Sequence, residues 1–203
     1  VRDEEEVASY CPNVACPGRR LEALAHFTSR DAMDIRGLSY QRLEQLIAAG
    51  LVIDACDIFT LTAEQVAGLE RFAERSAEQL IAAIDASRQQ PLSRLLNAIG
   101  IRHVGAESAK LLARSFGSME ALEGASVDEL EALHGVGHTM AEAVHAFFHD
   151  PAAEALVAKL RAAGVRMDEP KAVAADGVFK GMKIVLTGTL PTLSRGQATE
   201  LVE

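Results

Sequence analysis

Apolar residues follow a repeated pattern along this chain of 203 residues: an apolar segment, a tight turn and a second apolar segment. The pattern occurs four times. Its turns begin at Ile35, Leu69, Ile101 and Leu133, which are 34, 32 and 32 positions apart. Such regular spacing indicates a repeated supersecondary unit. We therefore expect four copies of one unit within a single helical array.

The segments on both sides of each turn are predicted to be helices. Thr62 with Gln65, and Ser126 with Glu129, have the spacing of a capping box directly before the second and fourth turns. After each turn, apolar residues recur at the helical spacing of three or four positions. These residues are Leu43, Leu46 and Ile47; Ala77, Leu80, Ile81 and Ile84; Ala109, Leu112 and Phe116; and Ala141, Val144 and Phe148. The predicted fold is mainly α, with four tandem helix-hairpin-helix motifs and a further helix over 151–163.

The character of the chain changes beyond that helix. Residues 167–177 lack periodicity and include Pro170, which predicts a linker. Lys183-Ile-Val-Leu-Thr-Gly188 is a short β-branched run of the kind found in buried strands, and Ser194 is placed to cap a new helix. We expect residues 178–203 to open a different, α/β domain.

The turns themselves suggest phosphate binding. The fourth turn has Gly135 and Gly137 followed by the small residue Ala141, and the third keeps Gly105 and Ala109. Glycine allows a tight turn and lets the backbone approach a phosphate with no Cβ in between. A helix that begins at the second glycine directs its N–H groups and its positive dipole end at an anion. The alternative is that these are ordinary glycine turns of a helical array.

Three of the turns depart from the glycine pattern. Ser39 replaces the second glycine of the first turn, and His103 replaces the first glycine of the third. The second turn has Arg71 and Ala73 at the two glycine positions, so we expect it to serve packing rather than phosphate binding. For the charged candidates near the third turn, an exposed surface position without a ligand is the open alternative. The candidate DNA-binding residues are Gly37, Arg102, His103, Gly105, Lys110, Gly135, Gly137 and His138.

Composition limits the class of protein. Hydrophobic residues make up 49% and aromatic residues 4%, so the core must be aliphatic, as in closely packed helices. The net charge of −9 argues against a generic basic nucleic-acid binder. It does not argue against phosphate binding by backbone N–H groups, which need little positive charge. No apolar run is long enough for a membrane helix, and three cysteines do not form a disulfide framework, so we expect a reducing cytoplasmic setting.

The flanking motifs add a family resemblance. The array resembles the helix-hairpin-helix domain of bacterial NAD-dependent DNA ligases, and the stretches 26–34, 95–105 and 183–190 are similar to that family as well. Upstream, Tyr10-Cys-Pro-Asn-Val-Ala-Cys-Pro17 resembles the second half of its four-cysteine zinc finger. Downstream, residues 179–203 resemble the start of its BRCT domain. Both ends of the chain are expected to continue in a longer protein.

The resemblance implies an organisation and a function. Cys11 and Cys16 would be two of four zinc ligands, with a spacing that suits a structural site. The parent protein would seal nicks in double-stranded DNA without sequence preference, as a monomer, with NAD as adenylyl donor and Mg²⁺. That chemistry needs a Lys-x-Asp-Gly nucleophile, which none of the lysines provides, so no catalytic residue is assigned. The expected segments are a half zinc finger over 1–19, a DNA-binding domain over 20–166, a linker over 167–177 and a truncated BRCT domain over 178–203.

Two alternatives remain at this stage. One is a non-catalytic repair factor with tandem hairpins, which would not carry the cysteine pair and the BRCT start in this order. The other is a helical repeat scaffold for protein partners. The acidic charge suits a scaffold, but a scaffold would not need glycine at the tips of its turns.

Overall fold

A computed structural model describes residues 17–70, 72–170 and 185. The chain divides into one compact unit that ends at Pro170 and a second from Lys171 onward, and the fold below is that of the first unit. Cys11, Cys16 and the predicted strand and helix of 178–203, apart from Val185, lie outside the described residues.

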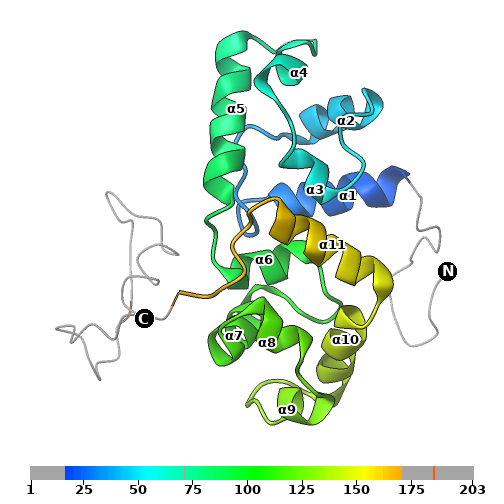
Figure 1. Cartoon of the computed structure of the whole chain (residues 1–203), viewed down its shortest axis with the longest axis vertical. Coiled ribbons are helices and arrows are strands. Elements are labelled where there is room, and N and C mark those ends of the chain that lie inside the picture. The colour runs from blue at the N-terminus through cyan, green and yellow to red at the C-terminus, as the bar shows by residue number, and fades with distance from the viewer. Residues whose placement is uncertain (1–16, 71, 171–184, 186–203) are drawn as a thin grey trace. The chain divides into compact units, whose positions relative to one another are not determined.

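The described part of the chain contains eleven α-helices and no strand, which confirms the mainly helical prediction (Figure 1). The helices are α1 (Pro17–Thr28), α2 (Tyr40–Ala48), α3 (Ala55–Ile58), α4 (Ala63–Ala67), α5 (Glu74–Ser87), α6 (Leu92–Ile99), α7 (Ala106–Phe116), α8 (Met119–Glu123), α9 (Val127–Glu131), α10 (His138–Phe148) and α11 (Pro151–Ala162).

Each of the four predicted turns lies between two helices that contact one another. We name them hairpin 1 (35–39, between α1 and α2), hairpin 2 (69–73, between α4 and α5), hairpin 3 (101–105, between α6 and α7) and hairpin 4 (133–137, between α9 and α10). A short helix, α3, separates the first two, and α8 separates the last two. The order of hairpin, short helix and hairpin therefore occurs twice (Figure 1).

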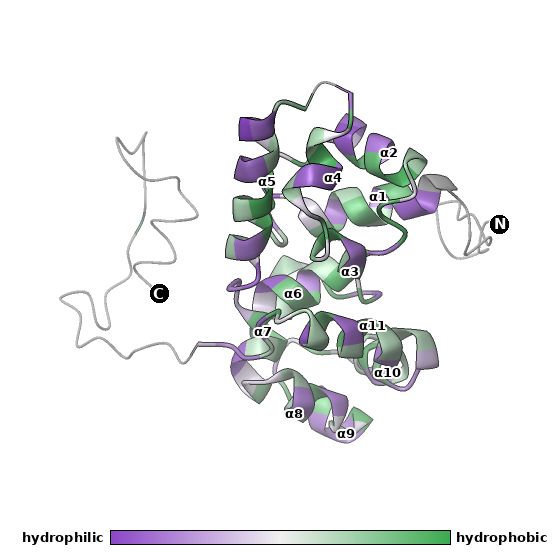
Figure 2. Cartoon of the chain, turned by 45° about the horizontal axis from the view of Figure 1, so that its top comes forward, coloured by the Kyte–Doolittle hydropathy of each residue, from purple (hydrophilic) through white to green (hydrophobic). Residues whose placement is uncertain are grey.

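The core is formed by the same positions of each hairpin. The residues four positions after the helix N-caps are Leu43, Ala77, Ala109 and Ala141, and all four have an exposed fraction of 0%. Three of the four are alanine, so the second helix can approach its neighbours closely. Figure 2 shows hydrophilic and hydrophobic residues alternating along α5, one of these helices. The apolar periodicity of the sequence thus marks the buried faces correctly.

Short helices in the array depend on their caps. Both predicted capping boxes are present: Thr62 with Gln65 begins α4, and Ser126 with Glu129 begins α9. Each of these helices has only five residues, too few to be stable without packing and satisfied terminal N–H groups. The sequence did not predict α3 and α8, because so short a helix shows no periodicity.

The segment after α11 returns to the helical unit. Backbone N–H groups of Leu92 and Met119 donate to the carbonyl oxygens of Asp168 and Met167, at 3.2 and 2.8 Å. The N–H of Glu169 donates to the Gly117 carbonyl at 2.9 Å. Residues 167–169, placed by the sequence at the start of a linker, are thereby bonded to the starts of α6 and α8 and the end of α7.

Candidate nucleic-acid interface

Each of the four hairpins contains the same kind of backbone hydrogen bond. The residue before each helix N-cap donates its N–H to the carbonyl three positions earlier, closing a tight turn. The pairs are Leu38 to Ile35 at 3.4 Å, Phe72 to Leu69 at 3.2 Å, Val104 to Ile101 at 3.0 Å and Val136 to Leu133 at 3.0 Å. Hairpin 2 thus keeps this bond although it has neither glycine.

The first glycine position has a left-handed backbone. Its φ angle is +98° at Gly37 and +101° at Gly135, a region that side chains rarely adopt. A Cβ added to Gly135 would also lie 3.4 Å from Leu111 Cδ2. His103 occupies this position in hairpin 3 with a φ of +65°. The turn itself therefore favours glycine at this position, because it needs a left-handed backbone.

The second glycine position has a different backbone conformation. Gly105 and Gly137 are the N-caps of α7 and α10, with extended φ angles of −97° and −90° that any residue can adopt. A Cβ on either would meet nothing within 4 Å. The turn needs no glycine here, so the absence of a side chain affects what can approach the helix end.

The four helix ends behind these N-caps are not equivalent. In hairpin 1 the Ser39 Oγ accepts the N–H of Arg42 at 3.4 Å, so that helix end is capped by its own side chain. The N-caps of α7 and α10 provide no side-chain acceptor. An acceptor from outside the chain, such as a phosphate oxygen, can therefore take the place of a cap in hairpins 3 and 4.

Charged groups near hairpin 3 are exposed. Arg102 and His103 lie at its tip, and Lys110 on α7 forms an ion pair with Glu107 at 3.2 Å. An exposed ion pair of this kind is weak, so Lys110 can exchange its partner for a phosphate. The structure thus keeps the predicted cations close to the predicted glycine.

Hairpin 4 carries a histidine between two carboxylates. His138 Nδ1 bonds to Glu131 Oε1 from α9, and its Nε2 lies 3.2 Å from Glu142 Oε1. The hydrogen bond to Glu131 and the negative charge of Glu142 raise the pKa of His138 above its usual value. Among the predicted DNA-binding residues, His138 is thus held between two carboxylates of its own chain, whereas Lys110 is paired with one.

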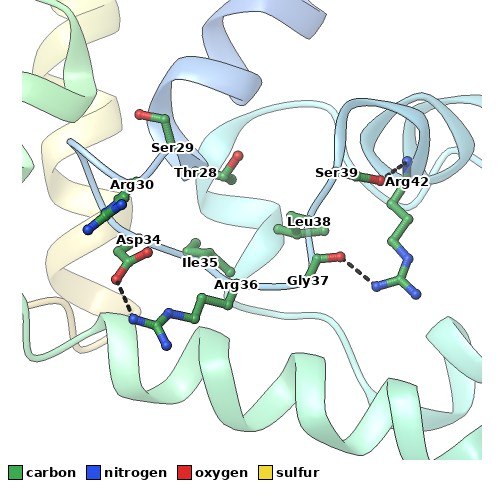
Figure 3. Close-up of a pocket in the computed structure, with 10 residues that line it drawn as sticks. All are labelled: Thr28, Ser29, Arg30, Asp34, Ile35, Arg36, Gly37, Leu38, Ser39 and Arg42. Atoms are coloured by element: carbon green, nitrogen blue, oxygen red, sulfur yellow. Dashed lines mark hydrogen bonds and ion pairs between the residues drawn. The ribbon is translucent and has the colours of Figure 1, made fainter. Parts of the chain in front are cut away.

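Hairpin 1 borders a shallow hollow that sequence reasoning did not find as a site (Figure 3). Arg30, Arg36 and Arg42 all line it, together with Gly37, the predicted DNA-binding residue of this hairpin. Arg30 and Arg42 are twelve positions apart and belong to no motif, so only the fold brings them together. The one sequence signal available was Arg36 directly before Gly37.

No metal centre is formed by the described residues, since they contain no group of three or more histidine, cysteine or carboxylate side chains that could hold an ion. Cys56 is buried, and burial together with the nearby Asp54 raises the pKa of its thiol to about 12. The thiol is therefore protonated at neutral pH. None of the helices in the described part of the chain is long and apolar enough to cross a membrane.

Comparison with known proteins agrees with this geometry. Residues 94–157, which include hairpins 3 and 4, match the family model of the helix-hairpin-helix motif. Over 98% of its length the chain is 58% identical to a protein of Gemmatimonas aurantiaca named DNA ligase. It is 49% identical over its full length to a DNA ligase of Symbiobacterium thermophilum, and 44% identical over 93% to DNA ligase 2 of Deinococcus deserti. The chain spans 29%, 31% and 27% of these relatives.

Proposed function

We propose that this chain is the duplex-gripping segment of an NAD-dependent DNA ligase. The observation that carries the proposal is glycine at the N-caps of α7 and α10, where neither the φ angle nor the space requires it. Both glycines fall within the segment that matches the helix-hairpin-helix motif. Relatives named DNA ligase match nearly the whole chain, which supports the same reading.

The residues of this chain would bind and orient DNA rather than react with it. Phosphate oxygens would accept hydrogen bonds from the first N–H groups of α7 and α10, with Arg102 and Lys110 beside them. Contacts to phosphates fix the position of a duplex and read no bases, so binding would not depend on sequence. The duplex would be held around a nick, whose 3′-hydroxyl and 5′-phosphate are joined elsewhere in the parent enzyme.

Cys11 and Cys16 would supply two thiolates to a structural zinc site completed upstream, and residues 178–203 would begin a BRCT domain. NAD supplies the adenylyl group in such enzymes, and both NAD and Mg²⁺ would bind outside this segment. We expect a monomer that works in the cytoplasm.

A pair of matched substitutions tests the phosphate-binding role. Gly137→Asp and Ala73→Asp both place a carboxylate at a helix N-cap with extended backbone, and both should stabilise the helix that follows. In hairpin 4 the carboxylate would occupy the place of a phosphate and repel it. We expect Gly137→Asp to raise the dissociation constant for a nicked duplex by about tenfold, equivalent to about 1.4 kcal/mol. Ala73→Asp should change it less than about twofold.

The measurement is a titration of the full chain with nicked duplexes of two unrelated sequences at one salt concentration. Thermal unfolding of each variant shows whether both are folded and more stable than the parent. If both aspartates weaken binding equally, or if neither does, the hairpin-specific role is wrong. If the parent binds no duplex, the scaffold alternative replaces the ligase proposal.

A further inference from the structure

Hairpins 3 and 4 share an uncapped helix end but differ in the charge beside it. Hairpin 3 has Arg102 at its tip and Lys110 on α7. Hairpin 4 has Glu131 at the end of α9 and Glu142 on α10, with His138 between them. A carboxylate beside a phosphate site repels the ligand, so hairpin 4 needs a compensating positive charge before it can bind one.

His138 belongs both to the helix end and to this charged group. It is the first residue of α10, so its backbone N–H is among those that would face a phosphate. Its Nδ1 bonds to Glu131 Oε1, and its Nε2 lies 3.2 Å from Glu142 Oε1. Both ring nitrogens carry a proton only in the imidazolium, which can then donate to the two carboxylates together. The side chain is 68% exposed, so solvent can protonate it in the folded protein.

The other charged groups around hairpin 4 act elsewhere. They are Asp128 and Glu129 on α9, His134 in the turn, His145 on α10, and Glu154, Lys159 and Arg161 on α11. Glu129 caps α9, His145 stacks on His149, and the two cations of α11 form ion pairs with carboxylates of other segments. From α7, the side chain beside the turn is the apolar Leu111. The charges that act on His138 are those of Glu131 and Glu142.

We propose that the triad of Glu131, His138 and Glu142 makes phosphate binding at hairpin 4 depend on a proton. When His138 is protonated, its charge offsets one carboxylate and its ring holds both in hydrogen bonds. A phosphodiester group of the duplex can then bind at the start of α10. When His138 is neutral, the two carboxylates repel that phosphodiester. This inference rests on the proposed function and adds a condition under which hairpin 4 takes part in it.

The proton and the phosphate favour one another. A phosphate beside His138 stabilises the imidazolium, so duplex binding raises the pKa of His138 further and takes up a proton. The two carboxylates already hold the pKa of His138 above its usual value in the free protein, and below that raised pKa the affinity does not change with pH. Above it the affinity falls as pH rises, until His138 is neutral in the complex as well.

The experiment is a titration of the full chain with a nicked duplex at constant ionic strength, from about pH 6 to about pH 9, where a histidine of raised pKa titrates. We expect the affinity of the parent to fall about fivefold over this range, the effect of one screened charge near the site. His138→Gln should bind at every pH about as weakly as the parent does at the highest pH. The double variant Glu131→Gln with Glu142→Gln should keep the tighter binding at the highest pH, because no carboxylate is left to repel the phosphate.

Two control variants separate the triad from general effects of charge. Glu154→Gln removes an exposed carboxylate of α11, outside every hairpin, and should keep the pH profile of the parent. His103→Asn replaces the histidine of hairpin 3 by a residue that tolerates the φ of +65°, and it should also keep the fall of affinity with pH. Circular dichroism at each pH shows whether the variants are folded.

Failure of this inference is distinguishable from failure of the proposed function. A parent that binds duplex equally well at every pH would overturn the proton-dependent site alone, and so would a folded His138→Gln variant with the parent's profile. Loss of the profile in His103→Asn, or a double glutamine variant that binds no more tightly than Glu154→Gln at the highest pH, would overturn it as well. A parent chain that binds no duplex at any pH would overturn both the inference and the proposed function.

Discussion

His103 and Gly135 occupy the same position of successive hairpins and share the left-handed conformation, with φ angles of +65° and +101°. Only one of them is a glycine. The left-handed conformation destabilises a residue with a Cβ by about 1 kcal/mol or more, so the backbone is strained in hairpin 3 and not in hairpin 4. In the proposed function, the strain is tolerated because it allows an imidazole at the tip of the hairpin.

Substitution at these two positions should have opposite effects. We expect His103→Gly to raise the free energy of unfolding by about 1 kcal/mol and Gly135→Ala to lower it by about 1–2 kcal/mol. The control is Gly105→Ala, at an extended N-cap with open space, which should change it by less than about 0.5 kcal/mol. Urea unfolding followed by circular dichroism measures all three, and a destabilised His103→Gly variant would refute the strain.

Stability should depend on pH through His138. Because its folded pKa is raised by Glu131 and Glu142, protonated His138 stabilises the fold below the unfolded pKa of about 6.5. This contribution is lost as pH rises through the raised folded pKa. We expect His138→Gln to lower the melting temperature at pH 5.5 and to have little effect at pH 8.5. Equal losses of melting temperature at the two pH values would contradict this prediction.

Arg88 should be one of the most important single side chains for stability. Its guanidinium donates to the Phe59 carbonyl at the end of α3, at 2.7 Å, and to the Ala163 carbonyl at the end of α11. The guanidinium also lies over the Phe59 ring. Two helix ends therefore depend on one cation. Arg88→Ala should cost about 2–4 kcal/mol, whereas the surface change Arg161→Ala should cost less than about 1 kcal/mol. Urea unfolding compares them, and equal losses would show that the junction is unimportant.

The helical unit should need residues past 166 for full stability. Glu169 caps α6 from a distance: its carboxylate accepts the Ser93 N–H at 2.8 Å and the Ser93 hydroxyl at 3.0 Å. Glu169→Ala should lower the free energy of unfolding by about 1 kcal/mol, the usual cost of a lost N-cap. A chain that ends at Arg166 should lose more than about 1 kcal/mol of unfolding free energy, because the backbone hydrogen bonds of residues 167–169 are removed too. Equal melting temperatures for chains ending at 166 and 170 would contradict this.

Several features of the fold were accessible from the sequence because they depend on local chemistry. Helical spacing identified the buried positions Ala77, Ala109 and Ala141, and two of the three capping boxes, those of α4 and α9, were recognised from residues three positions apart. The helices α3 and α8 were missed, since four or five residues cannot show a period. The segment 167–169 read as a linker because its partners, near residues 92 and 117, are distant in sequence.

The sequence by itself determined the repeated hairpins, their glycines and the helix ends that follow, because turn and cap preferences act over a few neighbouring residues. Only the tertiary structure decided what each glycine does: a positive φ at Gly135 and an open, uncapped helix end at Gly137. It also brought Arg30, Arg36 and Arg42 to one hollow and set His138 between Glu131 and Glu142. Charges that meet through packing leave no spacing in the sequence, so their pairing is fixed only when the helices assemble.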